Sequence, residues 1–368
     1  MTFCAFLLVA ALQSPPADPS RALDLARQEL RLGHLDRAEA QFRAALETTP
    51  ADVDARIGLG MVLTRKGDWR GALDVLVPME RQAGENGDYF AALGRAFRRA
   101  GDDRRAYEAF RRAVALSRDD PELRAGYENA AMAHGHAVAV EGLGQHVAPG
   151  SDSATGSLAA SIRVTDRLHV LGLVRTRTDS GVSDLIAGGG AQCRLARGTI
   201  LTLRASGGSA NVALPSSDLA ADALHYSGPF EAGGGIRELS YAGVAVTALS
   251  ATTAWDRGER WRFATRYTYS RSRFDSTGDS NGDHSIVLRP TFRATRRLWF
   301  HGAYAYGIES FEDLTAERIR ELGSTTAAAG IRVGLRSLTL ITGTWEHQWR
   351  SNDSRLDRVT LSLVQFFP

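Results

Sequence analysis

The sequence predicts an α + β chain of two domains, a solenoid of paired helices followed by an antiparallel transmembrane β-barrel of about fourteen strands. Two changes of pattern lead to this fold class. Glycines recur every 34 residues up to about residue 136, at Gly33, Gly67, Gly101 and Gly135. Beyond that point apolar residues recur at every second position, in stretches of about ten residues separated by turn residues.

Residues 1–17 are predicted to be a signal peptide. The apolar run from Phe3 to Leu12 is too short to span a bilayer as a helix, which needs about 20 residues, but it has the length of a signal core. No lysine or arginine precedes it and no clear cleavage motif follows, so it departs from the usual signal in both respects. We therefore expect export, with the helical domain in the periplasm and the strands in the outer membrane.

The composition excludes several functional classes. The formal net charge is +2, so the balance of charge gives no argument for a nucleic-acid partner, and we expect none. The two cysteines, Cys4 and Cys193, provide neither a zinc-ligand spacing nor a disulfide framework. His134, His136 and His146 lack a further metal ligand at helical spacing, and no nucleophile elbow or phosphate loop is present. We expect a protein without a cofactor, a metal or an enzymatic activity.

The helical domain is predicted over residues 20–135. Small residues recur where helices cross and bulky residues recur four positions later, as in the pairs Ala38 and Phe42, Ala72 and Leu76, and Ala106 and Phe110. With its 34-residue period, this region resembles the tetratricopeptide repeat (TPR) family, which implies pairs of antiparallel helices. The missing tryptophan of helix A, and Gly84 where the second unit would end in proline, are departures. A further helix over 121–133 would cap the solenoid.

The TPR resemblance implies a concave groove lined by the first helix of each repeat. The arginines carried over to that groove are Arg27, Arg31, Arg65, Arg95, Arg98 and Arg99. One interpretation is a binding site for a periplasmic protein or an anionic polysaccharide. The alternative is that these arginines simply lie on solvated helix faces, since acidic residues are as frequent as basic ones in this domain.

The strand domain is predicted over residues 137–368. From Trp261 to Arg271, aromatic residues alternate with polar ones, the pattern of a strand with one lipid-facing side. Long and short connections also alternate along the chain, the longer ones including 149–154, 211–217, 275–283 and 311–323. A membrane barrel with both termini at one end requires this alternation, whereas the alternative, a soluble β-sandwich, does not.

The C-terminal stretch resembles the YaiO-type outer-membrane β-barrel family. The similarity rests on 307–318, on Asp357-Arg358-Val359-Thr360-Leu361 and on Gln365-Phe366-Phe367. Pro368 after the terminal aromatic pair is a departure. The resemblance implies a place in the outer membrane and a barrel preceded by TPR repeats, but it implies no biochemical role.

The alternating pattern places a set of arginines on the inward face of the barrel. The predicted basic patch consists of Arg262, Arg266, Arg289, Arg293 and Arg332, with further inward arginines at Arg163, Arg175, Arg204, Arg237 and Arg358. The strand acids assigned inward are few, chiefly Glu231 and Glu309. Such a lumen would favour anions. In the alternative, acids of the 311–323 loop fold into the mouth and pair with the arginines.

Three hypotheses of function follow. The first is an outer-membrane pore with a periplasmic TPR scaffold, in envelope polysaccharide handling or export. The second is a closed barrel anchor whose TPR domain recruits a periplasmic protein. The third is a hydrolase at the rim of the barrel, for which no motif is present.

Overall fold

The computed structural model describes residues 19–179, 181–196, 198–208, 213–258, 260–307, 324–335, 338–350 and 354–368. The chain divides into two compact units, Met1–Ala130 and Ala131–Pro368. The first unit is helical, and the second consists almost entirely of strands.

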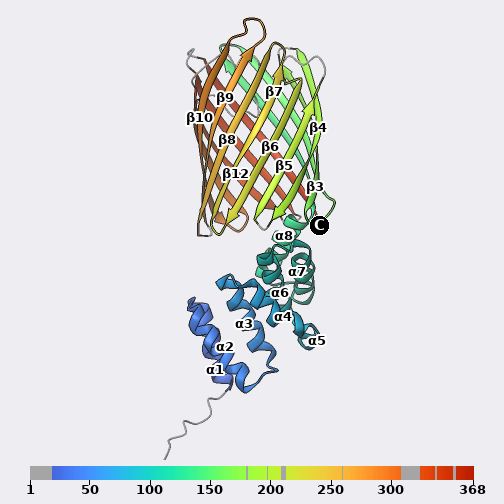
Figure 1. Ribbon diagram of the computed structural model, residues 1–368, viewed down its shortest axis with the longest axis vertical. Coiled ribbons are helices and arrows are strands. Elements are labelled where there is room, and N and C mark those ends of the chain that lie inside the picture. The colour runs from blue at the N-terminus through green and yellow to red at the C-terminus, as the bar shows by residue number, and fades with distance from the viewer. Residues whose placement is uncertain are drawn as a thin grey trace, which may run out of the picture. The chain divides into compact units, whose positions relative to one another are not determined.

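Short antiparallel helices form the first unit and continue to residue 134 (Figure 1). Their bounds are α1 Pro19–Leu32, α2 Leu35–Thr48, α3 Val53–Lys66, α4 Trp69–Leu76, the 3₁₀ turn η1 Val77–Met79, α5 Glu80–Ala83, α6 Gly87–Ala100, α7 Asp103–Leu116 and α8 Pro121–His134. No helix in the described ranges is long and apolar enough to cross a membrane.

Capping residues define where several helices begin and end. The side chains of Asp52, Asp68 and Asp102 each accept a hydrogen bond from the backbone N–H three residues later, which satisfies an orphan donor of the first turn. Gly67 and Gly101 end α3 and α6 in the left-handed conformation, with φ of 88° and 77°. The regular spacing of these glycines therefore marks helix ends.

The helical core uses the small and bulky positions of the repeat. Ala38, Ala72 and Ala106 are all 0% exposed. The ring of Phe110 occupies the space left by Gly94, since a Cβ on that glycine would come within 2.8 Å of the ring. Close helix approach therefore depends on these small residues, as the repeat spacing predicts.

Gly135 differs from the other three glycines of the 34-residue series. It joins the end of α8 to the first strand, whereas the other three lie between two helices. A Cβ at Gly135 would meet the main chain of Phe367 and the carbonyl oxygen of Ala131, the latter at 2.8 Å. Position 135 therefore requires glycine because a side chain would not fit, and not because the backbone makes a left-handed turn.

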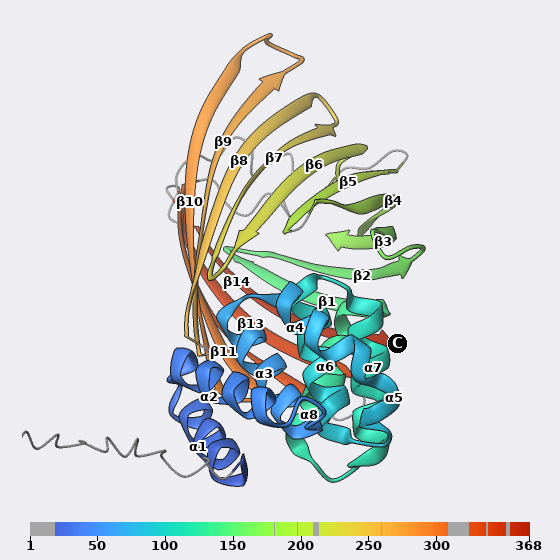
Figure 2. The same ribbon diagram turned by 60° about the horizontal axis from the view of Figure 1, so that its bottom comes forward.

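The second unit is a closed antiparallel barrel, as the fold class predicts (Figures 1 and 2). Each strand pairs with its sequence neighbours, and the first closes the barrel against the last, with His136 opposite Phe367. The strands are β1 His136–Ala148, β2 Ser151–Arg163, β3 Leu168–Asp179, β4 Val182–Ala196, β5 Thr199–Gly207, β6 Ser217–Ser227, β7 Phe230–Tyr241, β8 Val244–Arg257, β9 Trp261–Phe274, β10 Ser280–Thr295, β11 Leu298–Gly307, β12 Ser324–Leu335, β13 Thr339–Arg350 and β14 Arg355–Phe367.

The two ends of the barrel differ in their connections. We call the end where β1 begins and β14 ends the terminal end, and the opposite one the loop end. Connections at the terminal end are short, such as 228–229 between β6 and β7 and 296–297 between β10 and β11. Longer connections, such as 208–216 and 275–279, lie at the loop end. As predicted, the longest connections lie at one end, but the lengths do not alternate strictly, since the loop-end connections 149–150 and 242–243 have only two residues each and the terminal-end connection 164–167 has four.

Some strands reach further at the loop end than predicted. Residues 149–154 and 275–283 were interpreted as loops, but β2 begins at Ser151 and β10 at Ser280. Backbone pairing continues there, with Ser280 opposite Arg273, and polar side chains do not prevent such pairing. The predicted loop at 311–323 lies outside the described residues.

The outer face of the barrel is apolar. Its exposed large side chains include Trp255, Trp261, Phe263, Tyr267, Leu288, Tyr304, Tyr306, Ile331, Trp345, Leu361 and Leu363. Aromatic residues face outward on β8, β9, β11 and β13. An outward apolar band that includes aromatic side chains is typical of barrels that face lipid.

Candidate lumenal site

The register of the strands assigns side chains to the lumen, because directly opposite residues in an antiparallel pair share a face. The inward arginines of the described strands are Arg163, Arg175, Arg177, Arg194, Arg204, Arg237, Arg262, Arg266, Arg289, Arg293, Arg332, Arg350 and Arg358. The inward acids are Glu141, Asp179, Asp184, Asp218, Asp222, Glu231, Asp256, Asp283 and Glu346. Arginines outnumber acids, so the described wall carries a positive balance.

The strand acids correct the sequence analysis, which assigned few acids inward. Glu309 lies outside the described residues, whereas Asp218, Asp222, Asp256 and Glu346 face the lumen and were missed. Each of these four forms an ion pair with an inward arginine. Much of the arginine charge is therefore compensated by the strands themselves.

Arg262 shows this compensation within the predicted patch. Its guanidinium donates to Glu231 at 2.5 Å and to Asp256 at 3.1 Å, joining β9 to β7 and β8. Because two carboxylates flank this single cation, the site around Arg262 has a local negative balance.

The other patch residues are spread over β9, β10 and β12, and their contacts with described residues are mostly to neutral groups. Arg266 donates to the Thr252 hydroxyl at 3.2 Å, and Arg332 donates to that of Thr342 at 3.3 Å. Arg293 lies over the Trp299 ring, 5.8 Å from its centroid. Arg289 is exposed in the lumen. This wall therefore retains positive charge near the terminal end.

The loop-end half of the lumen is buried around the barrel. The buried inward residues there include Gln145, Ser153, Arg177, Ile186, Leu239, Val246, Ser270, Ser285, Thr326, Gln348 and Arg358. Leu239, Tyr241, Val244, Val246 and Phe274 also form an apolar cluster. Patch residues such as Arg262 and Arg289 are more accessible. The lumen is accordingly occluded toward the loop end and open in its terminal half.

Asp184 is a central contact of the occluded half. The carboxylate is 4% exposed and accepts backbone hydrogen bonds from Ala213 at 2.5 Å and Leu214 at 2.8 Å. Leu214 is itself 4% exposed. The described part of the connection from β5 to β6 is thereby held against the inward face of β4.

Half of the predicted TPR groove arginines contact neighbouring helices. Arg27 pairs with Asp54 at 2.7 Å, and Arg95 pairs with Glu122 at 2.6 Å. These two pairs occupy equivalent positions two repeats apart and link the first helix of one repeat to that of the next. Arg65 donates to the carbonyl oxygen of Leu30 at 3.0 Å. The remaining groove residues, Arg31, Arg98 and Arg99, are exposed.

Another inter-helix charge cluster joins α2 and α3. Lys66 donates to Asp36 at 2.6 Å and to Glu39 at 2.8 Å. The hydrogen bond from Lys66, followed by that from Arg43, holds the pKa of Glu39 below its ordinary value of 4.5. The single lysine of the chain thus joins consecutive repeats.

Metal and thiol chemistry gain no support from the geometry. Within the described parts of the chain, no group of three or more histidine, cysteine or acidic residues could hold a metal ion. His136 accepts a hydrogen bond at Nδ1 from the Arg163 backbone, and the Arg163 side chain contacts His134. Cys193 is a half-buried free thiol in β4.

Comparison with known families identifies the repeats. The tetratricopeptide repeat family matches residues 23–77 and 90–124, so these segments are TPR repeats, as predicted. No curated protein sequence matches the chain significantly. The resemblance of the barrel to the YaiO-type family is not tested by these matches and stays a prediction.

Solved structures similar to this chain include both barrels and repeat proteins. A protein described as a bacterial polysaccharide outer membrane secretin is 12% identical over 64% of this chain and 99% of its own, with a TM-score of 0.46. An anion-selective porin from Comamonas acidovorans is 10% identical over 63% of this chain and 98% of its own, with a TM-score of 0.37. A thermophilic TPR protein from Thermus thermophilus is 26% identical over 32% of this chain and 66% of its own, with a TM-score of 0.29.

Proposed function

We propose that the protein is an outer-membrane pore, closed in the conformation described, with a periplasmic TPR scaffold that serves the handling or export of an anionic envelope polysaccharide. The observation that carries this proposal is the basic lumen. Its terminal half is accessible and lined by Arg266, Arg289, Arg293 and Arg332. Arginines on a pore wall stabilise anions in transit more than cations.

The apolar outer face and the connections support the membrane location. Aromatic and aliphatic side chains face outward around the barrel. In outer-membrane barrels the short turns lie in the periplasm, so the terminal end and the chain leading into it would face that compartment. The TPR domain would then meet a polymer or its biosynthetic proteins before the barrel does.

The occluded loop end defines how the proposed pore must work. An export pore in this conformation would be shut, and the contact between Asp184 and the 213–214 backbone would have to break for it to open. The partner held by the TPR domain would favour opening if it binds the open state more tightly.

Planar-bilayer recording of the refolded full chain tests this proposal. We expect low basal conductance, occasional openings and anion preference under a salt gradient. Absence of any conductance, in wild type and in an Asp184→Ala variant, would overturn the pore.

The second candidate is a closed anchor that recruits a periplasmic protein through its TPR domain. The burial around the loop-end half favours it directly, since an anchor needs no continuous channel. In that case neither the wild type nor the Asp184→Ala variant conducts, while the helical unit alone determines which periplasmic proteins co-purify.

A further inference from the structure

An aromatic ring and two arginines lie side by side in the terminal half of the lumen, on β10, β11 and β12. Trp299 of β11 faces the lumen and lies opposite Arg332 of β12 in the strand register. On its other side Trp299 is opposite Arg293 of β10, whose guanidinium lies over the indole, 5.8 Å from the ring centroid. Trp299 is half-buried, so part of its ring is accessible from the lumen.

Two glycines of β12 give the rings of β11 room to lie along the wall. Gly330 and Gly334 are inward positions of β12. A Cβ on Gly334 would lie 3.5 Å from the Trp299 ring, and a Cβ on Gly330 would overlap the ring of His301. His301 extends across β12 and hydrogen-bonds with the Thr344 hydroxyl at 2.9 Å. The indole and the imidazole therefore both lie beside the bare backbone of β12.

Both arginines beside the indole keep hydrogen-bond donors available. Nε of Arg293 donates to the carbonyl oxygen of Thr295 at 3.3 Å, and Nε of Arg332 donates to the Thr342 hydroxyl at 3.3 Å. The terminal nitrogens of these two side chains have no hydrogen-bond partner among the described residues. A guanidinium in this state can bind a carboxylate through two parallel hydrogen bonds.

The acids of the surrounding strands do not occupy these donors. In the described parts of β10 to β13, the inward acids are Asp283 and Glu346, and both lie nearer the loop end. Glu346 pairs with Arg358 at 3.2 Å, and on the other side of the site Asp256 pairs with Arg262 at 3.1 Å. The two arginines beside the indole are therefore available to an anion.

We infer that Trp299, Arg293 and Arg332 form a binding subsite for an acidic pyranose unit of a polysaccharide. The C–H face of the sugar ring would lie on the accessible part of the indole, and its carboxylate would accept hydrogen bonds from the terminal nitrogens of the two arginines. Thr342 and Thr344 lie on the inward face of β13 and would bind ring hydroxyls. The choice of a polysaccharide rests on the proposed function, whereas the requirements for a ring and an anion rest on the indole and the guanidinium groups.

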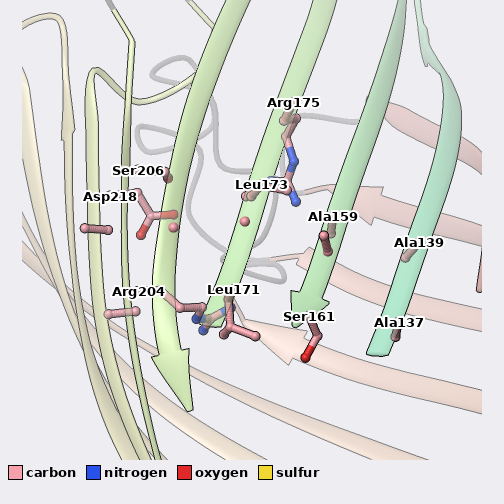
Figure 3. Close-up of a pocket in the computed structure, with 15 residues that line it drawn as sticks. Ala137, Ala139, Ala159, Ser161, Leu171, Leu173, Arg175, Arg204, Ser206 and Asp218 are labelled. Carbon is pink, nitrogen blue, oxygen red and sulfur yellow. The ribbon is translucent and has the colours of Figure 1, made fainter. Parts of the chain in front are cut away.

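A cavity of about 310 Å³ against β1 to β6 lacks this combination of groups (Figure 3). Its surface includes several alanines together with Leu171 and Leu173, and none of the described residues that line it is aromatic. Arg204, which also lines it, donates to Asp222 at 3.0 Å. This part of the wall therefore supplies a reference arginine for the test of the subsite.

Calorimetry of the full chain, in a detergent without a sugar headgroup, tests the subsite. The probes are short oligogalacturonates, neutral maltooligosaccharides of equal length and oligoglutamate, an anion without a ring. Wild type should bind the oligogalacturonates at least about tenfold more tightly than either of the other two probes. Equal binding of maltooligosaccharides would overturn the role of the arginines, and equal binding of oligoglutamate would overturn the role of Trp299.

Substitutions separate the subsite from the total charge of the lumen. Trp299→Leu and Arg332→Gln should each weaken oligogalacturonate binding by about tenfold, whereas Trp299→Phe should retain most of it. Tyr226→Leu removes another accessible inward aromatic side chain, on β6, and is the matched control for the indole. Arg204→Gln removes the same single charge from the lumen as Arg332→Gln and is the matched control for the guanidinium. Both controls should bind as wild type.

Failure of the subsite and failure of the pore can be told apart, because binding does not require conductance. No binding of oligogalacturonates by a wild type that conducts anions overturns the subsite and leaves the pore standing. Binding without any conductance overturns the pore and leaves the subsite. Unchanged binding in Trp299→Leu overturns the subsite, and so does an equal loss in Arg204→Gln and Arg332→Gln, since binding would then follow the total charge. Heat-modifiable gel migration shows that each variant has formed its barrel, and Trp299→Thr replaces Trp299→Leu if the latter fails this check.

Discussion

Asp184 is the buried carboxylate whose contact with the 213–214 backbone would have to break for the proposed pore to open. It accepts hydrogen bonds from two consecutive backbone N–H groups, at Ala213 and Leu214. Removing the acceptor leaves the buried N–H of Leu214 and the half-buried N–H of Ala213 unpaired, and an unpaired buried donor costs about 1–3 kcal/mol. We predict that Asp184→Ala raises the mean conductance and the open time in planar bilayers. Asp152→Ala, which removes an exposed outward carboxylate, is the control, and equal conductance of all three proteins would contradict the prediction.

The hydrogen bond from Lys66 to Glu39 allows a test of how much a single charged contact stabilises the TPR unit. Its pKa is lowered by Lys66 and Arg43, so its contribution to stability is present above the ordinary pKa of 4.5 and is lost as pH falls through the lowered value. We predict that Lys66→Met unfolds at lower temperature than wild type near pH 7. The difference in unfolding temperature should shrink toward zero as the pH falls below the lowered pKa of Glu39. Unfolding is followed by the helical circular dichroism signal of the full chain. A constant difference across acidic pH would exclude the charge as its cause.

The residue contacts of the lumen were the least predictable part of the site. Alternation alone showed that Arg204, Arg237 and Arg262 face inward, and the structure places them there. Their partners depend on which residues lie opposite across strands, and a shift of one residue would exchange the two faces. Asp218 and Asp222 were missed because they lie in β6, where the alternating pattern is weak.

Helix crossings in the TPR unit give a prediction at the scale of one element. Ala72 in α4 is 0% exposed, so an arginine there adds volume and a charge to a filled core. We predict that Ala72→Arg destabilises the repeats by more than about 3 kcal/mol. Protease digestion of the full chain should then cleave residues 20–135 while the barrel resists. Asp74→Arg, on an exposed position of the same helix, should leave the resistance unchanged.

Elements were predictable where the period of the sequence is strong. The 34-residue repeat located the helices, and alternation located most strands, because each period reflects burial of one face. β2 and β10 begin earlier in the sequence than the alternation predicts, because polar residues continue the backbone pairing beyond the apolar band. The contact of Asp184 with the 213–214 backbone could not be foreseen, because it involves a connection that carries no period.

At the scale of the whole molecule, the apolar outer face predicts how the protein behaves in cells and on gels. We predict that it fractionates with the outer membrane and migrates faster on gels when unheated, as closed barrels do. Recovery in the soluble periplasmic fraction would contradict the lipid-facing interpretation of residues such as Trp345 and Leu361.

Ion selectivity depends on the sum of the charges in the lumen. It distinguishes the arginines that form ion pairs within the described strands from those that do not. Changing Arg266, Arg289, Arg293 and Arg332 to glutamine removes cations that contact mostly neutral groups, so we predict that anion preference is lost. Changing Arg262 as well uncovers Glu231 and Asp256, and the preference should then reverse toward cations. The measurement is the reversal potential under a salt gradient. Arg271→Gln/Arg273→Gln, on the outward face of β9, is the control, and a preference that survives all five lumenal changes would show that selectivity arises elsewhere in the barrel.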